Sequence, residues 1–264
     1  MKLSNIKHQS LTSMFFSRKT LESDLIQLPF SSASDLAIFK GKFGDNNYIY
    51  TTQDIISKIK IDPSRMAIVE NWSPENASGC SIFLLSAKVR LHIKTRVSGI
   101  SLVVGNAVNG NIEVRYLNYP GYVIIGDDVT AYGLSIRSHG GSISIGRYGL
   151  ISEEVIIQGH DGHAIIDLAS GRLLNDNSRD CVIEDYVWIA RRVTIMPGAV
   201  IGKGSIVGAT STVVGNIPSF CLVVGVPARV IRENVSWSRT RDAIDRVAKK
   251  WLARHGNNLP SNDI

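Results

Sequence analysis

The chain has 264 residues, of which 44% are hydrophobic and 20% are charged, and its formal net charge is +6 at pH 7. This length predicts one large domain with a smaller one, and the core is ample. No uninterrupted apolar stretch is long enough for a transmembrane helix, and the basic residues are too dispersed for a nucleic-acid-binding surface. Three cysteines without a CxxC pair argue against a disulfide framework or a zinc site and fit a reducing cytosol.

The first 79 residues contain no six-residue repeat, and we expect a mixed α/β region there, to which the sequence assigns no role. The N-terminus is basic but lacks the apolar segment of a signal peptide. A short helix is expected to begin at Thr52 or Gln53 and to continue through Ile55, Ile56 and Ile59.

From Ile82 to Ile93 the pattern becomes that of a strand. In KVRLHI (88–93) apolar and polar residues alternate, which is typical of a strand with one buried face. We therefore expect a second domain to begin near residue 80.

A period of six residues dominates from Ile183 to Pro218. The segment reads IEDYVW IARRVT IMPGAV IGKGSI VGATST VVGNIP, with Ile or Val at the start of every block. A period of six is neither a helix period nor a simple strand alternation, and it indicates a solenoid of short strands with one aliphatic side chain per block inside. Blocks beginning at Val104, Ile125 and Ile145 continue the count with slips in phase.

The longest break in the repeat lies between His163 and Val182. A polar loop of this length is uncommon in a compact fold, and it is either functional or a tolerated insertion. Where the repeat stops, the segment IIQGHDGHAII (156–166) places two histidines beside Asp161. A partly exposed histidine titrates near neutral pH and suits a general base, although a lone histidine is more often a surface or packing residue.

Trp188 ends its hexad, where the side chain should point outward. It either packs under the 164–182 loop or lines a ligand groove, and the two interpretations are compatible. Farther along, apolar residues recur at helical spacing, which predicts an amphipathic C-terminal helix and a frayed tail from Gly256 to Ile264. The apolar residues of that pattern are Trp237, Ile244, Val247, Ala248 and Trp251.

The hexads, GHDGHAIID (159–167), DYVWIA (185–190) and VVGVPARVIREN (223–234) together resemble the hexapeptide-repeat acyltransferases, most closely the bacterial sugar and polysaccharide O-acetyltransferases. The resemblance covers about residues 100–232. It implies a mainly β protein: a left-handed parallel β-helix acetyltransferase domain over residues 80–232, followed by a C-terminal helix and tail over residues 233–264.

The resemblance also implies catalytic residues. The family's S-x-D-x-H-x-I segment corresponds to Gly159, Asp161, His163 and Ile165. His163 then takes the place of the general base, and Asp161, Glu153 or Glu154 would orient its ring. His160 and His139 are expected near the acceptor.

Acetyl-CoA is the co-substrate that the resemblance implies. Trp188 is expected to line the groove for acetyl-CoA and the acceptor. The family often has a Thr-Lys pair that contacts a phosphate; this chain lacks the pair, and Lys203 is expected to substitute for it. The other expected contacts to the cofactor are Ala190, Arg191, Ala209, Arg229 and Arg232.

The implied reaction is direct transfer of an acetyl group to a sugar hydroxyl of a bacterial capsule or O-antigen, in a cytoplasmic homotrimer with active sites between subunits. Three alternatives stay open. One is N-acetylation of an amino sugar or antibiotic, and another is a non-catalytic hexapeptide scaffold. The third is a trimeric carbonic anhydrase, which would need zinc on His139, His160 and His163; the predicted site itself contains no metal.

Overall fold

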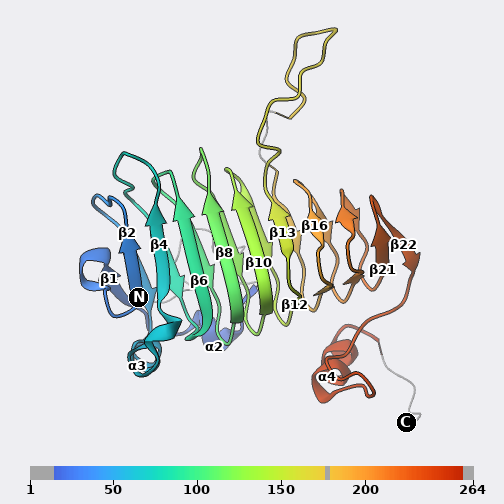
Figure 1. Ribbon diagram of the computed structural model, residues 1–264. Helices are drawn as coiled ribbons and strands as arrows, with labels where there is room; N and C mark the ends of the chain where they lie inside the picture. Colours follow the sequence, from blue (N-terminus) through green and yellow to red (C-terminus); the bar gives the residue numbers. More distant parts are fainter. Residues whose placement is uncertain (1–14, 176–178, 258–264) are drawn as a thin grey trace.

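The protein is a parallel left-handed β-helix in which successive coils stack along one axis, as the sequence predicted (Figure 1). The computed structural model describes residues 15–175 and 179–257. Two sheets run the length of the molecule, and their inner faces enclose a single continuous core. Among the described residues, no helix combines the length and the apolarity needed to cross a bilayer.

The first sheet contains one short strand from each coil, and its strands are parallel except for the antiparallel pair β1 and β3. In sheet order the strands are β1 (Ile26–Pro29), β3 (Tyr48–Thr51), β5 (Ser81–Leu84), β7 (Ser101–Val104), β9 (Tyr122–Ile125), β11 (Ser142–Ile145), β14 (Cys181–Ile183), β17 (Val200–Ile201) and β20 (Asn216–Ile217).

The second sheet begins with longer strands and then divides. Its first strands are β2 (Ala37–Lys40), β4 (Ala67–Asn71), β6 (Lys88–Thr95), β8 (Asn109–Tyr116) and β10 (Thr130–Ser138). The start of β10 pairs with β12 (Leu150–Ile151), and its end pairs with β13 (Val155–Gln158).

Two columns of short strands continue from this division. The lower strands are β12, β15 (Trp188–Ile189), β18 (Ile206–Val207) and β21 (Leu222–Gly225). The upper strands are β13, β16 (Thr194–Ile195) and β19 (Thr212–Val213). The final strand, β22 (Ala228–Arg232), turns back and pairs antiparallel with β21.

The aliphatic residue that opens each hexad fills the interior, as predicted. Ile183, Ile189, Ile195, Ile201, Val207 and Val213 are each at most 1% exposed. Parallel pairing stacks like on like, so that Ile157, Ile195 and Val213 form one ladder along the upper strands. Burying each side chain contributes about 1.5–3 kcal/mol, and the contribution depends on the neighbouring coils being in place.

The solenoid extends farther toward the N-terminus than the expected boundary at residue 80. Strand β3 pairs in parallel with β5, and β4 pairs with β6, so the sheets cross that boundary without interruption. These coils were not predictable from the sequence, because buried and exposed residues alternate along strands of four or more residues and no six-residue repeat is present. The strands of residues 26–79 therefore continue into the two sheets of the solenoid, with α3 among them.

The predicted helix near residue 53 is confirmed as α3 (Gln53–Ile61), whose first turn is capped by the Thr52 side chain accepting from the Ile55 N–H. Its buried residues, Ile55 and Ile59, close the N-terminal end of the core. The short helices η2 (Phe30–Ser32) and η3 (Pro63–Arg65) lie in the same coils.

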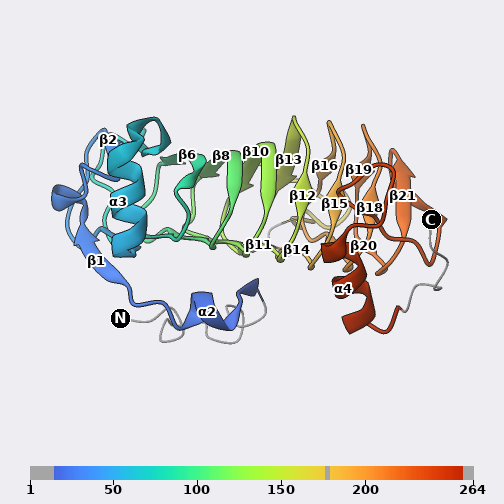
Figure 2. The same cartoon turned by 90° about the horizontal axis from the view of Figure 1, so that it is seen from below.

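The first described residues lie across the outside of the first sheet, where α2 (Arg18–Leu21) is seen in Figure 2. Phe15 and Phe16 pack on outward side chains of β5, β7 and β9. The Thr20 hydroxyl and the Ser17 N–H both donate to the buried Asp127 carboxylate, at 2.7 and 2.8 Å. The prediction that the N-terminus lacks the apolar segment of a signal peptide concerns residues that lie mainly outside the described part of the chain.

At the other end, the predicted C-terminal helix is confirmed as α4 (Arg246–Arg254), with Asp245 as its N-cap. Trp237 and Ile244 precede this helix. The Tyr186 ring stacks on both Trp237 and Trp251, with centroids 4.6 and 4.5 Å apart, and the Trp237 indole N–H donates to the Tyr186 carbonyl at 2.8 Å. The C-terminal segment thereby covers the lower strands. The predicted frayed tail begins at Gly256, but the Gly256 and Asn257 N–H groups still donate to carbonyls of α4. Residues 258–264 of that tail lie outside the described residues.

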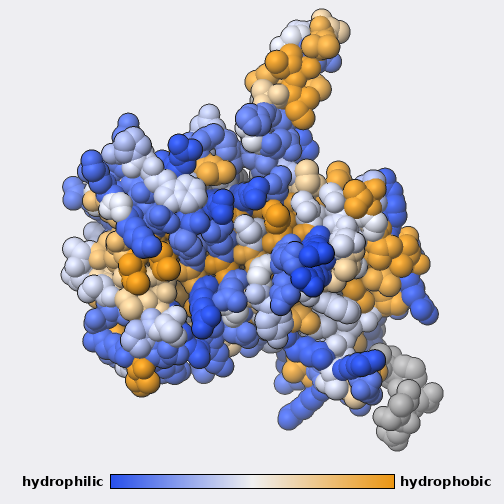
Figure 3. All heavy atoms as spheres, viewed as in Figure 1, coloured by the Kyte–Doolittle hydropathy of each residue, from blue (hydrophilic) through white to orange (hydrophobic). Residues whose placement is uncertain are grey.

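Between β13 and β14, residues 159–175 leave the solenoid as a projecting arm (Figure 1). A bridge between Ile166 and Leu173 holds its two sides together. Figure 3 shows that the projecting part is largely hydrophobic on the surface. Its exposed aliphatic residues are Ile165, Ile166, Leu168, Leu173 and Leu174.

Candidate active site

Two histidines meet where the arm leaves the wall. His139 follows β10 and His160 follows β13, and the parallel register of Arg137 with Gln158 puts the histidines on adjacent coils. Their rings stack with centroids 4.0 Å apart, and Tyr119 contacts the far side of His139 at 5.2 Å. We call these three residues the histidine corner.

The two imidazoles have different environments. His139 is 8% exposed, and its burial, together with the nearby His160, lowers its pKa. Both causes favour the neutral form of His139 over the charged form. His160 is half-buried, and its Nδ1 accepts a hydrogen bond from the Gly162 N–H at 2.8 Å. In the neutral form, this bond places the His160 proton on Nε2.

Asn175 organises the base of the arm. It is 7% exposed, and its Nδ2 donates to the Asp161 carboxylate at 3.0 Å and to the His163 carbonyl at 2.9 Å. Its Oδ1 accepts from the Ile165 N–H at 2.8 Å. The sequence marks Asn175 only as part of a polar loop, because its partners lie 10–14 residues earlier in the chain.

His163, the expected general base, lies on the arm with an exposed side chain. Asp161 contacts Asn175, and Glu154 pairs with Arg191 and Arg192. Within residues 15–175 and 179–257, no carboxylate is in hydrogen-bond or ion-pair contact with the His163 imidazole. In these parts of a single chain, the expected orienting carboxylate is therefore absent around His163.

Trp188 lies on the outer face of the lower strands, against the C-terminal segment. Its ring centroid is 6.2 Å from that of Trp237. It lines a cavity of about 870 Å³ together with Leu150, Ile206, residues 236–244, Lys249 and Leu252. The packing partner is therefore the C-terminal segment, whereas the 164–182 loop projects away from the solenoid.

Several expected cofactor contacts stack along the corner between the lower and upper strands. The register of β15 with β18 aligns Ala190 and Arg191 with Gly208 and Ala209, and the Thr210 N–H donates to the Arg191 carbonyl at 2.9 Å. Arg192 and Thr210 both have a φ near +60°, the left-handed conformation that turns the wall sharply. We call this column of residues the second corner.

The remaining expected contacts divide between two places. Arg229 and Arg232 are exposed on β22, next to β21 at the C-terminal end of the lower column. Lys203 lies at the corner between the first sheet and the lower strands, where its N–H donates to Glu184. The structure thus groups Ala190, Arg191 and Ala209, and it separates Lys203 from them.

Within one chain, Trp188 and the histidine corner are not brought together. Trp188 is on a lower strand, whereas His160 lies beyond the far end of an upper strand. Among the described residues, no group of three or more His, Cys, Asp or Glu side chains is arranged to hold a metal ion. The three cysteines are buried and free.

Comparison with known sequences identifies the repeat. The family model described as "Bacterial transferase hexapeptide (six repeats)" matches residues 180–215. The chain is 38% identical over 122 residues to the "Polysialic acid O-acetyltransferase" of Escherichia coli O1:K1 / APEC, a match that spans 46% of this chain and 39% of that protein. It is 29% identical over 182 residues to the "Putative colanic acid biosynthesis acetyltransferase WcaF" of Escherichia coli (strain K12), spanning 67% of this chain and 88% of WcaF.

Comparison with solved structures supports the same fold. The polySia-specific acetyltransferase NeuO superposes with a TM-score of 0.62 at 22% identity, covering 83% of this chain and 97% of NeuO. At this identity the match shows the fold alone. Together with the sequence matches, it shows that the chain has the hexapeptide-repeat, left-handed β-helix fold, and that its sequence is similar to those of bacterial polysaccharide acetyltransferases.

Proposed function

We propose that the protein is an acetyl-CoA-dependent O-acetyltransferase that acts on a sugar hydroxyl of a bacterial cell-surface polysaccharide. The observation that carries this proposal is the stacked pair His139 and His160 at the edge of a hexapeptide solenoid. A histidine held at a fixed position on a rigid wall suits proton transfer from a hydroxyl group. The similarity to a relative named "Polysialic acid O-acetyltransferase" supports this acceptor class.

In this mechanism a histidine removes the proton of the acceptor hydroxyl as its oxygen attacks the carbonyl carbon of the acetyl thioester. The tetrahedral intermediate then expels the CoA sulfur, and the protonated imidazole returns the proton to that thiolate. No covalent acyl-enzyme forms, so acceptor and acetyl-CoA must be bound together. General-base assistance of this kind is worth about 10² to 10⁴ in rate.

We assign the base to His160, whereas the family resemblance implies His163. His160 is half-buried and stacked on the wall, but His163 lies on the exposed arm without an orienting carboxylate among the described residues. For Nε2 of His160 to accept a proton, Nδ1 must carry one, so the bond from the Gly162 N–H must open first. Gly162 has a φ of +85°, a conformation that glycine adopts readily.

The second corner supplies the place for the cofactor. An extended pantetheine arm would follow the backbone at Ala190, Arg191 and Ala209, with Trp188 on the adjoining face. Arg229 and Arg232, exposed on β22, would meet the phosphates at the C-terminal end, because a guanidinium pairs well with a phosphate. Lys203 is at a different corner and is left out of this assignment.

A homotrimer would complete the site. His160 and Trp188 lie at opposite margins of the outer wall in one chain, so a neighbouring chain must bring the two kinds of residue together. The arm, with Leu168 97% exposed, would contact that neighbour. We further propose that the reaction takes place in the cytoplasm, where three free cysteines would stay reduced.

The test is incubation with labelled acetyl-CoA and a panel of purified capsular and O-antigen polysaccharides, followed by NMR of the product. The expected result is an O-acetyl group on one sugar hydroxyl. An acetamide product would assign the chain to N-acetylation, and absence of acetyl-CoA binding by calorimetry would favour a scaffold. His160→Ala should abolish most of the transfer, and His163→Ala is its matched control.

A further inference from the structure

The C-terminal helix α4 presents one face to the solenoid and the other to the surroundings. Its buried residues are Ala248, Trp251 and Leu252. The Trp251 ring stacks on the Tyr186 ring and contacts the Phe220 ring, at centroid distances of 4.5 and 5.9 Å. In Figure 1, α4 stands out from the solenoid on the side opposite to the arm. The helix is therefore anchored through one face, and its other face is turned away from the solenoid.

The outer face of α4 combines positive charge with apolar surface. Arg246, Lys250 and Arg254 follow one another at intervals of four residues, which places them on the same face of the helix. All three are exposed. Val247 precedes Arg254 by about two helical turns and so lies beside them, with 46% of its surface exposed. We call these four residues the basic face.

The positive charge of the basic face is not neutralised by neighbouring carboxylates. Residues 239–254 contain six Lys or Arg side chains and two Asp side chains. Asp245 is occupied as the N-cap of α4, and Asp242 lies 3.8 Å from Arg241. Within residues 15–175 and 179–257, none of the three cations of the basic face forms an ion pair. The helix therefore keeps its charge for an external anion.

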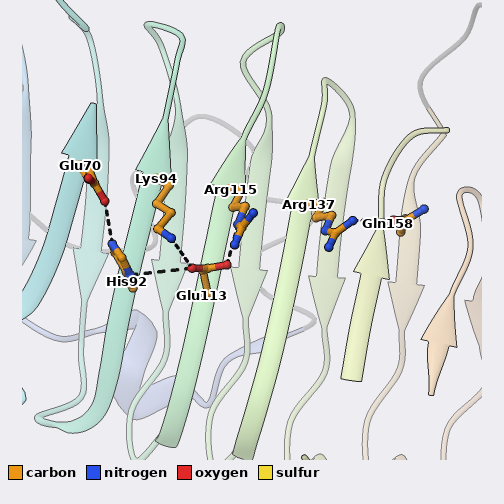
Figure 4. A network of polar contacts seen from close by, with 7 residues as sticks. All are labelled: Glu70, His92, Lys94, Glu113, Arg115, Arg137 and Gln158. Atoms are coloured by element: carbon orange, nitrogen blue, oxygen red, sulfur yellow. Dashed lines mark hydrogen bonds and ion pairs between the residues drawn. The ribbon is translucent and has the colours of Figure 1, made fainter. Parts of the chain in front are cut away.

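Cations on the long strands are held differently. Glu113 accepts from Lys94 Nζ at 2.8 Å and from Arg115 Nε at 2.6 Å (Figure 4). The same network continues through His92, whose Nε2 lies 3.1 Å from Glu70. Lys94 and Arg115 are thus paired within the protein, and the basic face of α4 is the contrasting case of grouped and unpaired cations.

We propose that the basic face docks the protein on the surface of an anionic lipid bilayer. Such a surface has a layer of phosphate groups, with which the three cations can pair, and an apolar layer beneath it, into which Val247 can insert. The flexible stems of Lys and Arg let their charged ends reach the phosphates while the helix lies along the surface. The association is peripheral, and it does not depend on the proposed acetyl transfer.

The kind of apolar surface near the cations favours a bilayer over a nucleic acid. Single-stranded nucleic acids bind through aromatic rings on which the bases stack. The indole rings of the C-terminal segment, Trp237 and Trp251, are instead buried in the stack on Tyr186. The exposed apolar side chains are aliphatic, since Val247 and Ile244, three residues before it, are each 46% exposed. Cations interspersed with aliphatic side chains fit an interface with lipid headgroups.

The test is cosedimentation of the full chain with vesicles of phosphatidylcholine alone and with vesicles of equal parts phosphatidylcholine and phosphatidylglycerol. At low salt the wild type should bind the anionic vesicles and leave the neutral ones. The triple variant Arg246→Gln, Lys250→Gln, Arg254→Gln should bind about a hundredfold more weakly, because each cation near an anionic surface contributes about fivefold. Val247→Gln alone should weaken binding severalfold, since the apolar insertion is lost.

The matched control is the triple variant Lys88→Gln, Arg90→Gln, Arg96→Gln, which removes the same charge from exposed positions in the other half of the solenoid. It should bind like the wild type. Circular dichroism of both triple variants should match the wild type, because Gln is a good helix former. Added salt should release the wild type from the vesicles, since the Debye length falls to about 3 Å at 1 M.

Three results would overturn the proposal. One is equal vesicle binding by the wild type and the α4 triple variant, and another is binding that ignores salt or lipid charge. The third is a wild type that leaves the anionic vesicles but binds a single-stranded DNA or a second copy of itself through the same cations. A changed oligomeric state in the α4 triple variant, measured by light scattering, identifies that last case.

Discussion

The two halves of the solenoid build the same core with different walls. From β6 to β10, the second sheet has strands of eight or nine residues. From β15 to β20, the strands shorten to two residues and the sequence repeats every six residues. A long strand presents several outward side chains on each coil, whereas a two-residue strand presents one. The long strands of the first half can therefore present several polar side chains in line, whereas the short strands of the second half lie between closely spaced corners.

The histidine corner lies at the junction of these halves, so its variants test the comparison most strongly. We expect His160→Ala to lower kcat by about 10² to 10⁴, because the general base is lost, with little change in the KM for acetyl-CoA. Steady-state kinetics with labelled acetyl-CoA measure this. A larger loss in His163→Ala than in His160→Ala would move the base from the wall to the arm.

A core variant in each half tests whether the halves fold as one unit. Ile93 and Ile195 are both fully buried, and changing either to Ala should lower the free energy of unfolding by about 2–5 kcal/mol. Each variant should still unfold in a single transition, since the sheets are continuous. Denaturation followed by circular dichroism and by tryptophan fluorescence gives the answer, and two separated transitions would show independent halves.

The third prediction is that the arm between the two halves can be loosened without destabilising the solenoid core. Asn175→Ala removes three hydrogen bonds at the base of the arm, each worth about 0.5–1.5 kcal/mol. We expect faster proteolysis and faster hydrogen exchange in residues 159–180, with the melting temperature nearly unchanged. Arg172→Ala, an exposed change on the same arm, is the control. A large fall in melting temperature would mean that the arm supports the coils.

The smallest expected effect concerns pH. His139 has a lowered pKa in the folded protein, so the unfolded chain binds more protons between the folded and unfolded pKa values. Its contribution to stability is fully present above the unfolded value of about 6.5 and is lost as the pH falls through the folded value. Urea denaturation across this range should show a shallower pH dependence in His139→Gln than in the wild type. Identical slopes would contradict the burial argument.

The sequence predicted the half that repeats and missed much of the half that does not. The burial of Ile195, and of the residue that opens each of the other hexads, was predictable because an aliphatic residue recurs at every sixth position. The coils before residue 80 carry strands such as β4, whose alternation occurs in many folds. Alternation in β6 predicts an entry to the solenoid there, although β2 and β4 precede it in the same sheet.

The candidate site was predictable only where it depends on local sequence. The segment around His160 and the outward Trp188 are recognisable from the repeat. The stacking of His139 on His160 depends on the parallel register of β10 with β13, which pairs Arg137 with Gln158. The Trp188–Trp237 contact depends on how the C-terminal segment turns back. No spacing in the sequence reveals either contact.

The antiparallel strands β1 and β22 have a consequence for the behaviour of the protein in solution. A stack of parallel coils has no intrinsic length, because its last strand offers unpaired N–H and C=O groups on which another coil, or another molecule, can add. Strand β1 reverses direction at one end of the first sheet, and β22 does so at the opposite end of the second. Each reversed strand occupies an edge that would otherwise template end-to-end polymerisation. We expect these two strands to disfavour the parallel addition of another coil at the two edges that they occupy, while β2 and β20 form the other two ends of the sheets.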